Sequence, residues 1–86
     1  MTFEGAVIKE QGVSFAIVVV KEYVLNSPSE CNNARSGFQT IFPRMPIILM
    51  AQNSRGVPRY QGRTDIVNFL ANVHPSRIPW KRYNYN

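Results

Sequence analysis

Arginines and aromatic residues alternate in two segments, and these side chains are the strongest candidates for binding a ligand. One segment covers residues 55–63 and the other is the C-terminal stretch 77–85. Cations interleaved with aromatic rings are typical of surfaces that neutralise phosphates and stack bases. If both segments lie side by side, they form a basic, aromatic strip for nucleic acid or another phosphate ligand. The candidate ligand-binding residues are Arg55, Arg59, Tyr60, Arg63, Trp80, Lys81 and Arg82.

The charge distribution also favours an anionic partner. The chain has a net charge of +5, and it is unevenly placed. Residues 1–34 contain two basic and four acidic side chains, a balance of −2, whereas residues 35–86 contain eight basic and one acidic, a balance of +7. A basic half is typical of proteins that bind nucleic acid, phosphate or an acidic protein surface. The alternative interpretation is that these charges only keep a small domain in solution.

Cys31, the single cysteine, is the other residue of chemical interest. It falls in the first turn of a predicted helix that follows a buried strand, and helix N-termini favour thiolates. The stretch from Pro46 to Val73 resembles the second half of a thioredoxin-like fold, in which a proline opens a strand and a hairpin and a helix follow. The resemblance implies thiol chemistry at Cys31, although Ala34 stands where a C-x-x-C motif has its second cysteine. Alternatively, Cys31 is a small apolar residue on a buried helix face.

Hydrolytic and metal chemistry find little support. One histidine and one cysteine cannot build a four-ligand zinc site within one chain. There is no glycine-rich phosphate loop, and the five acidic residues are dispersed. His74 precedes Pro75 at a predicted helix end, where it would interact with the helix dipole. We therefore predict no catalytic residue, metal or cofactor, and favour a non-enzymatic domain that binds an anionic ligand.

Protein interaction or homodimerisation is the first alternative function. Enrichment in tyrosine and arginine, with little lysine, suits a contact surface. Small domains also gain stability by dimerising. Pro58 and Pro79 fall on predicted edge strands, where proline protects against open-ended strand pairing.

Length and composition indicate one globular domain spanning residues 1–86. The 86 residues are 44% hydrophobic and 17% charged, which is enough for a single core. No stretch approaches the roughly 20 apolar residues that span a bilayer. Glu4 stands where a signal peptide would carry positive charge. With one cysteine, nothing requires an oxidising compartment, so we expect a cytoplasmic protein that does not bind membranes.

Apolar runs and turn residues predict five strands. The first two are joined by a turn at Glu10-Gln11-Gly12, whose glycine can take a positive φ. The alternation over residues 21–25 is interpreted as the second strand leaving the core. The strands are predicted over residues 4–9, 13–20, 47–51, 57–61 and 77–85.

Two helices are predicted between these strands. The first begins at Ser27–Glu30, where Ser27 is the N-cap, proline takes the first position and the glutamate completes a capping box. It ends before Pro43. The second helix begins at Thr64-Asp65 and ends at His74-Pro75.

These elements predict an α+β domain with a mixed sheet packed by two helices. Their order is strand, strand, helix, strand, strand, helix, strand. The strand–helix–strand unit should be a right-handed crossover between parallel neighbours, flanked by antiparallel hairpin partners. Val18 and Leu49 should be almost inaccessible, and Phe38 and Phe69 should pack from the helices onto the sheet.

Overall fold

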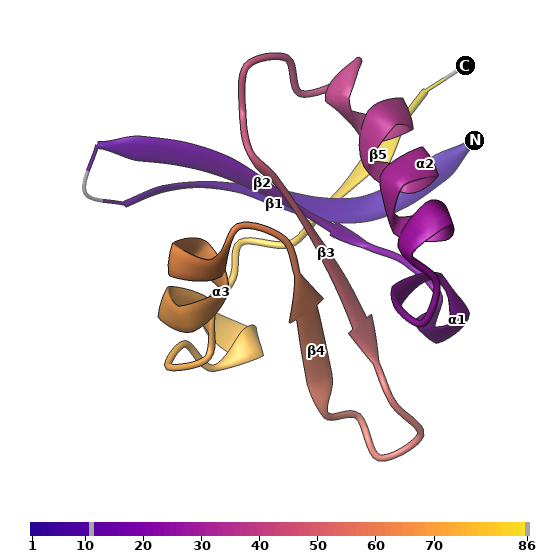
Figure 1. Ribbon diagram of the computed structural model, residues 1–86. Coiled ribbons are helices and arrows are strands. Elements are labelled where there is room, and N and C mark those ends of the chain that lie inside the picture. Colours follow the sequence, from indigo (N-terminus) through magenta and orange to yellow (C-terminus); the bar gives the residue numbers. More distant parts are fainter. Residues whose placement is uncertain (11, 86) are drawn as a thin grey trace.

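The computed structural model describes residues 1–10 and 12–85; Gln11, in the predicted first turn, and Asn86 lie outside the described residues. Within that part of the chain, five strands and three α-helices follow one another (Figure 1). The elements are β1 (Thr2–Glu10), β2 (Val13–Val19), α1 (Glu22–Leu25), α2 (Pro28–Gln39), β3 (Ile47–Gln52), β4 (Pro58–Gln61), α3 (Thr64–Leu70), the 3-10 helix η1 (Pro75–Arg77) and β5 (Lys81–Asn84).

The strands form one mixed sheet in the order β4-β3-β2-β1-β5. β2 and β3 are parallel, with Val18 opposite Leu49, and the other neighbours are antiparallel. A parallel pair is the expected product of the strand–helix–strand crossover. The hairpins β1–β2 and β3–β4 add one antiparallel strand to each side of this parallel pair. β5 pairs with the outer side of β1 and is the edge strand there. The predicted α+β class and mixed sheet are therefore confirmed.

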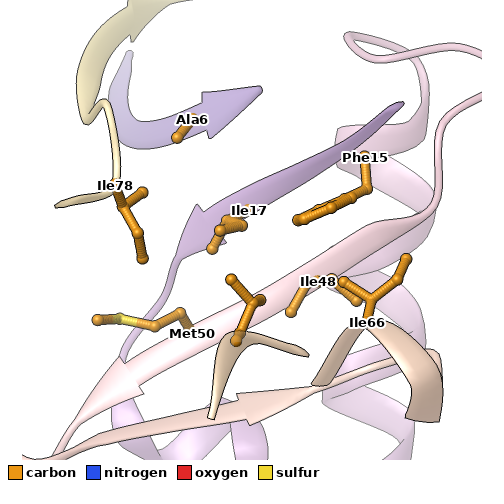
Figure 2. Close-up of a cluster of buried hydrophobic side chains, with 8 residues drawn as sticks. Ala6, Phe15, Ile17, Ile48, Met50, Ile66 and Ile78 are labelled. Atoms are coloured by element: carbon orange, nitrogen blue, oxygen red, sulfur yellow. The ribbon is translucent and has the colours of Figure 1, made fainter. Parts of the chain in front are cut away.

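Helices cover both faces of the sheet (Figure 1). On one face, α1 and α2 pack over a cluster that includes Leu49, Cys31 and Phe42. On the other, α3 packs over a cluster that includes Ile17 and Ile48. Figure 2 shows this second cluster, in which side chains of the central strands point toward α3 and toward the segment before β5. The sheet therefore lies between two apolar layers, one on each of its faces.

The predicted core positions are confirmed. Val18 and Leu49 are 0% exposed. Phe38 of α2 is half-buried against one cluster, and Phe69 of α3 is half-buried against the other. Phe69 also meets Phe15 of β2 edge to face, with ring centroids 6.4 Å apart.

The N-cap and the first-turn proline of α2 are as predicted, but the capping box and the segment before the helix are not. Ser27 Oγ accepts a hydrogen bond from the Glu30 N–H (3.3 Å), with proline in the first turn. The prediction of a strand end over residues 21–25 is wrong, because Glu22–Leu25 form α1 and Lys21 is its N-cap. The Ser27 N–H donates to the Val24 carbonyl (3.3 Å) as that short helix ends. The Ser27 N–H is therefore already bonded. Among the hydrogen bonds of the described residues none runs from the Glu30 side chain to Ser27, so the prediction of a capping box is wrong.

The C-terminal segment also differs from its prediction. α3 ends at Leu70, and His74 begins η1 instead of ending α3. His74 Nδ1 accepts a hydrogen bond from the Ser76 N–H (3.2 Å), so the imidazole caps a helix N-terminus and does not meet the dipole of α3. The last strand begins only at Lys81, because η1 occupies Pro75–Arg77.

Candidate functional site

The two arginine-aromatic segments lie at opposite edges of the sheet. The residues from 55 to 63 belong to the β3–β4 turn, β4 and the loop after it, whereas residues 80–82 lead into or lie on β5. The strand order places β4 and β5 four neighbours apart, which is roughly 19 Å across a sheet. The condition for one continuous strip, that both segments lie side by side, is therefore not met. The turn and β4 form one candidate surface, and β5 forms another.

At the β5 edge, the side chains are largely engaged within the domain. Trp80 is half-buried against the core, and its Nε1–H donates to the Pro75 carbonyl (3.1 Å). The Lys81 ammonium lies over the ring of Tyr83, 5.6 Å from its centroid. Arg82 stands opposite Glu4 of β1 in the strand register. The half-buried Trp80 ring offers less free surface for stacking than a ring that extends into solvent.

At the β4 edge, two arginines extend into solvent. Arg55 is exposed on the turn, where its backbone N–H donates to Asn53 Oδ1 (2.8 Å). Arg59 is exposed on β4, and its Nη1 donates to Asn26 Oδ1 (3.2 Å) on the α1 side of the sheet. Among the described residues, neither guanidinium forms a salt bridge. Most N–H donors of both guanidinium groups therefore remain available to an external anion.

Arg63 differs from its neighbours, because it already has a carboxylate. Its Nε and Nη2 donate to Asp65 Oδ1 (2.8 Å) and Oδ2 (2.9 Å) in a bidentate pair. The Arg63 hydrogen bonds and charge lower the pKa of the Asp65 carboxyl below its usual value. An anionic ligand would have to compete with Asp65 for this guanidinium. Arg63 therefore contributes less to the candidate site than Arg55 and Arg59.

Tyr60 points away from the arginines. Its ring packs with the cluster under α3, and its hydroxyl is buried with no hydrogen-bond partner among the described residues. Desolvation by this burial raises the pKa of the Tyr60 hydroxyl above its usual value. The half-buried ring therefore has little free surface on the side of the arginines.

This buried hydroxyl predicts a loss of stability at alkaline pH. The folded-state pKa of Tyr60 lies above the unfolded value near 10. The unfolded state therefore releases the proton first, and stability falls as pH rises through about 10 toward the folded-state pKa. Urea unfolding at pH 7 to 11 should show that Tyr60→Phe lacks this component. At pH 7 the variant should stay within about 1 kcal/mol of the wild type or exceed it, because an unsatisfied hydroxyl is removed. A constant difference between the two proteins from pH 7 to 11 would contradict the prediction.

An apolar groove beside β4 was not predicted from the sequence. It has a volume of about 630 Å³ and lies between β4, the end of α3 and the start of η1. The sequence signal for it is Val73 in the segment after α3, which helical spacing alone assigns to a longer helix. The groove is lined by Val57, Pro58, Tyr60, Val67, Leu70, Ala71, Asn72, Val73, His74 and Pro75.

Cys31 lies on the buried face of α2. It is 2% exposed, and its Sγ donates to the Val24 carbonyl (3.2 Å). A disulfide substrate could not reach this sulfur without movement of α1 or α2. The interpretation of Cys31 as a small core residue is therefore the one that its surroundings support.

Within residues 1–10 and 12–85, no three His, Cys, Asp or Glu side chains are grouped to hold a metal ion. No helix in the described part of the chain is long and apolar enough to cross a membrane. Comparison of the chain with protein-family models, curated proteins and solved structures finds no match. The candidate site therefore depends on its own geometry.

Proposed function

We propose that this domain binds an anionic ligand through the guanidinium groups at the β4 edge, with Arg55 and Arg59 as the principal contacts. The observation that carries the proposal is their common edge: two exposed arginines without a carboxylate partner among the described residues. Guanidinium groups bind phosphate and carboxylate through paired hydrogen bonds. The net charge of +5 adds a long-range attraction for anions.

The proposal assigns a smaller role to the other predicted ligand-binding residues. Tyr60 and Trp80 pack against the core, and Arg63 is neutralised by Asp65. Binding through Arg55 and Arg59 therefore rests on charge neutralisation and hydrogen bonding, without base stacking. Nucleic acids, phosphate groups and acidic protein segments all carry the required chemistry.

Two charge-matched double variants test the position of the site. Arg55→Ala/Arg59→Ala and Lys81→Ala/Arg82→Ala each remove two positive charges, but from opposite edges of the sheet. Labelled single- and double-stranded DNA and RNA, and polyglutamate, are titrated between 50 and 200 mM salt. We expect the first variant to bind about tenfold more weakly at 50 mM salt. Its salt slope with nucleic acid should flatten by roughly one to two units, because about 0.9 counterion is released per neutralised phosphate.

The second variant should bind within about twofold of the wild type. Both variants should unfold at nearly the wild-type urea concentration, since exposed charges contribute little to stability. Equal weakening by both variants would indicate diffuse attraction and contradict a site at β4. If no probe binds more tightly than about 100 μM at 50 mM salt, the domain does not bind anions by this chemistry.

A further inference from the structure

We infer that the anionic ligand is an extended protein segment of alternating apolar and acidic residues, which adds to β4 as a sixth strand. This inference rests on the proposed function, and it names the partner class of the same edge. Three features of the β4 edge carry it: unpaired backbone groups among the described residues, an apolar groove on one face, and arginines without a carboxylate partner in the described part of the chain, Arg59 on the other face and Arg55 on the adjoining turn.

The outer backbone edge of β4 has groups available to an added strand, although Pro58 supplies no N–H there. The Asn53 N–H donates to the Val57 carbonyl oxygen (3.0 Å), so these two residues face each other as a hydrogen-bonded pair. Such pairs recur at every second residue of an antiparallel ladder, so the next residue whose backbone N–H and C=O both bond to β3 is Arg59. At the alternate positions, Pro58 and Tyr60, the backbone groups point away from β3. Among the turn, loop and capping bonds of the described residues, none uses the Tyr60 N–H, the Tyr60 carbonyl or the Pro58 carbonyl. An added strand therefore finds one donor and two acceptors.

The groove supplies the apolar half of the recognition. It lies beside the same edge, and among the described residues His74 is the only titratable side chain apart from Tyr60 that lines it. Val57, at its rim, is 52% exposed. Because alternate side chains of a strand point to opposite faces of the sheet, every second residue of an added strand would point toward the groove. Apolar residues at those positions would bury their surface against Val57 and Val67.

The arginines supply the acidic half. The Arg59 guanidinium lies on the other face, where it bonds Asn26, and Arg55 stands on the adjoining turn. Asp65, the only acidic residue after position 34, is held by Arg63. The remaining side chains of an added strand would lie beside Arg59, so glutamate or aspartate at these positions would complement the charge. Strand addition with side-chain selection at alternate positions is an established mode of peptide recognition.

The same features argue against two other occupants. A second copy paired through β4 would bring Arg55 and Arg59 of both protomers together, and each chain carries a net charge of +5. A nucleic acid would leave the apolar groove unused and would find little free ring surface for stacking on Tyr60 or Trp80. An acidic strand uses both faces of the β4 edge.

A short synthetic peptide tests the inference directly. The probe is fluorescein-labelled Glu-Val-Glu-Val-Glu-Val-Glu, and binding is followed by anisotropy at 50 mM salt. A peptide with serine in place of valine keeps the charge and loses the apolar face. A third peptide with N-methylated valines loses alternate backbone donors. We expect both changes to weaken binding at least tenfold, and the Tyr60 amide to shift in NMR spectra on binding of the first peptide.

Two variants on α3 and its C-cap provide a matched pair. Ala71→Glu places a carboxylate at the exposed rim of the groove, whereas Asn68→Glu makes the same charge change on an exposed α3 residue that does not line it. Peptide binding should weaken at least tenfold in the first and at most twofold in the second. Urea unfolding of both variants confirms that they fold, so that a loss of binding reports on the groove.

The remaining possible outcomes would each contradict a specific part of the proposal. If nucleic acid or polyglutamate binds through Arg55 and Arg59 but the valine peptide binds no better than the serine peptide, the strand inference is wrong and the proposed function stands. Equal effects of Ala71→Glu and Asn68→Glu would also refute the groove. A dimer that dissociates only in Ala71→Glu would assign the groove to a second copy. If no anionic probe binds, both the inference and the proposed function are wrong.

Discussion

Leu49→Ala is expected to lower the free energy of unfolding by about 2–5 kcal/mol. Leu49 is 0% exposed on β3, opposite Val18 of β2, and lies in the cluster beneath α1 and α2. Truncation removes buried methyl groups and leaves a cavity that the two central strands cannot close, because each is fixed by ladders on both sides. Urea denaturation followed by circular dichroism measures the change.

Val57→Ala provides the control for this substitution. Val57 is 52% exposed, so truncating it removes little buried surface and should cost less than about 0.5 kcal/mol. A loss below about 1 kcal/mol at Leu49 would mean that β3 is not a central strand of the core. The two variants together separate burial from the mere loss of an apolar side chain.

Much of the fold could be predicted because local chemistry and burial agree along most of the chain. The run over residues 13–20 is apolar at successive positions, as a strand covered on both faces requires, and β2 has this environment. Ser27-Pro28 begins α2 as predicted, since the cap and the proline act locally. Gly12 takes a φ of 80° in the first hairpin. At residues 21–25, by contrast, a short alternation fits a strand as well as one helical turn, and tertiary packing of Val24 decides for α1.

The candidate site could be predicted only in part, because it depends on sheet order. Composition identifies the arginines and aromatic residues, but no local feature near Lys81 reveals that β5 pairs with β1 and not with β4. Arg63 and Asp65 are only two residues apart, so the sequence allows them to pair, but it equally allows Asp65 to act as a helix cap. Likewise, the groove forms between β4 and the segment after α3, which meet only in the folded chain. The sequence therefore identifies the residues that could bind a ligand, but it does not show which of them lie side by side in the folded chain.

Two glycines predict opposite responses to the same substitution. Gly5 lies in β1 between two paired strands, opposite Val18 of β2 and Lys81 of β5. A Cβ on Gly5 would stand 2.7 Å from the backbone carbonyl oxygen of Ile17, which the sheet holds in place. Gly37 lies in α2, and apart from its chain neighbours and the backbone of its own helix, no atom of the described residues lies within 4 Å of the position that a Cβ would take. We therefore expect the space around the added Cβ, and not the residue type, to decide whether the substitution raises or lowers the free energy of unfolding.

Gly5→Ala is therefore expected to lower the free energy of unfolding by about 1–3 kcal/mol, because the strand must shift to relieve the overlap. Gly37→Ala should raise it by about 0.5–1 kcal/mol, since alanine favours the helix and restricts the unfolded chain. Urea unfolding of both variants at pH 7 measures the two changes against one wild-type curve. The general gain from replacing glycine applies to both positions, so any destabilisation at Gly5 reports the crowding around its Cβ, chiefly by the Ile17 carbonyl oxygen and also by the Phe3 ring at 3.3 Å. Stabilisation by Gly5→Ala would mean that β1 is not packed against its neighbours as closely as the sheet register requires.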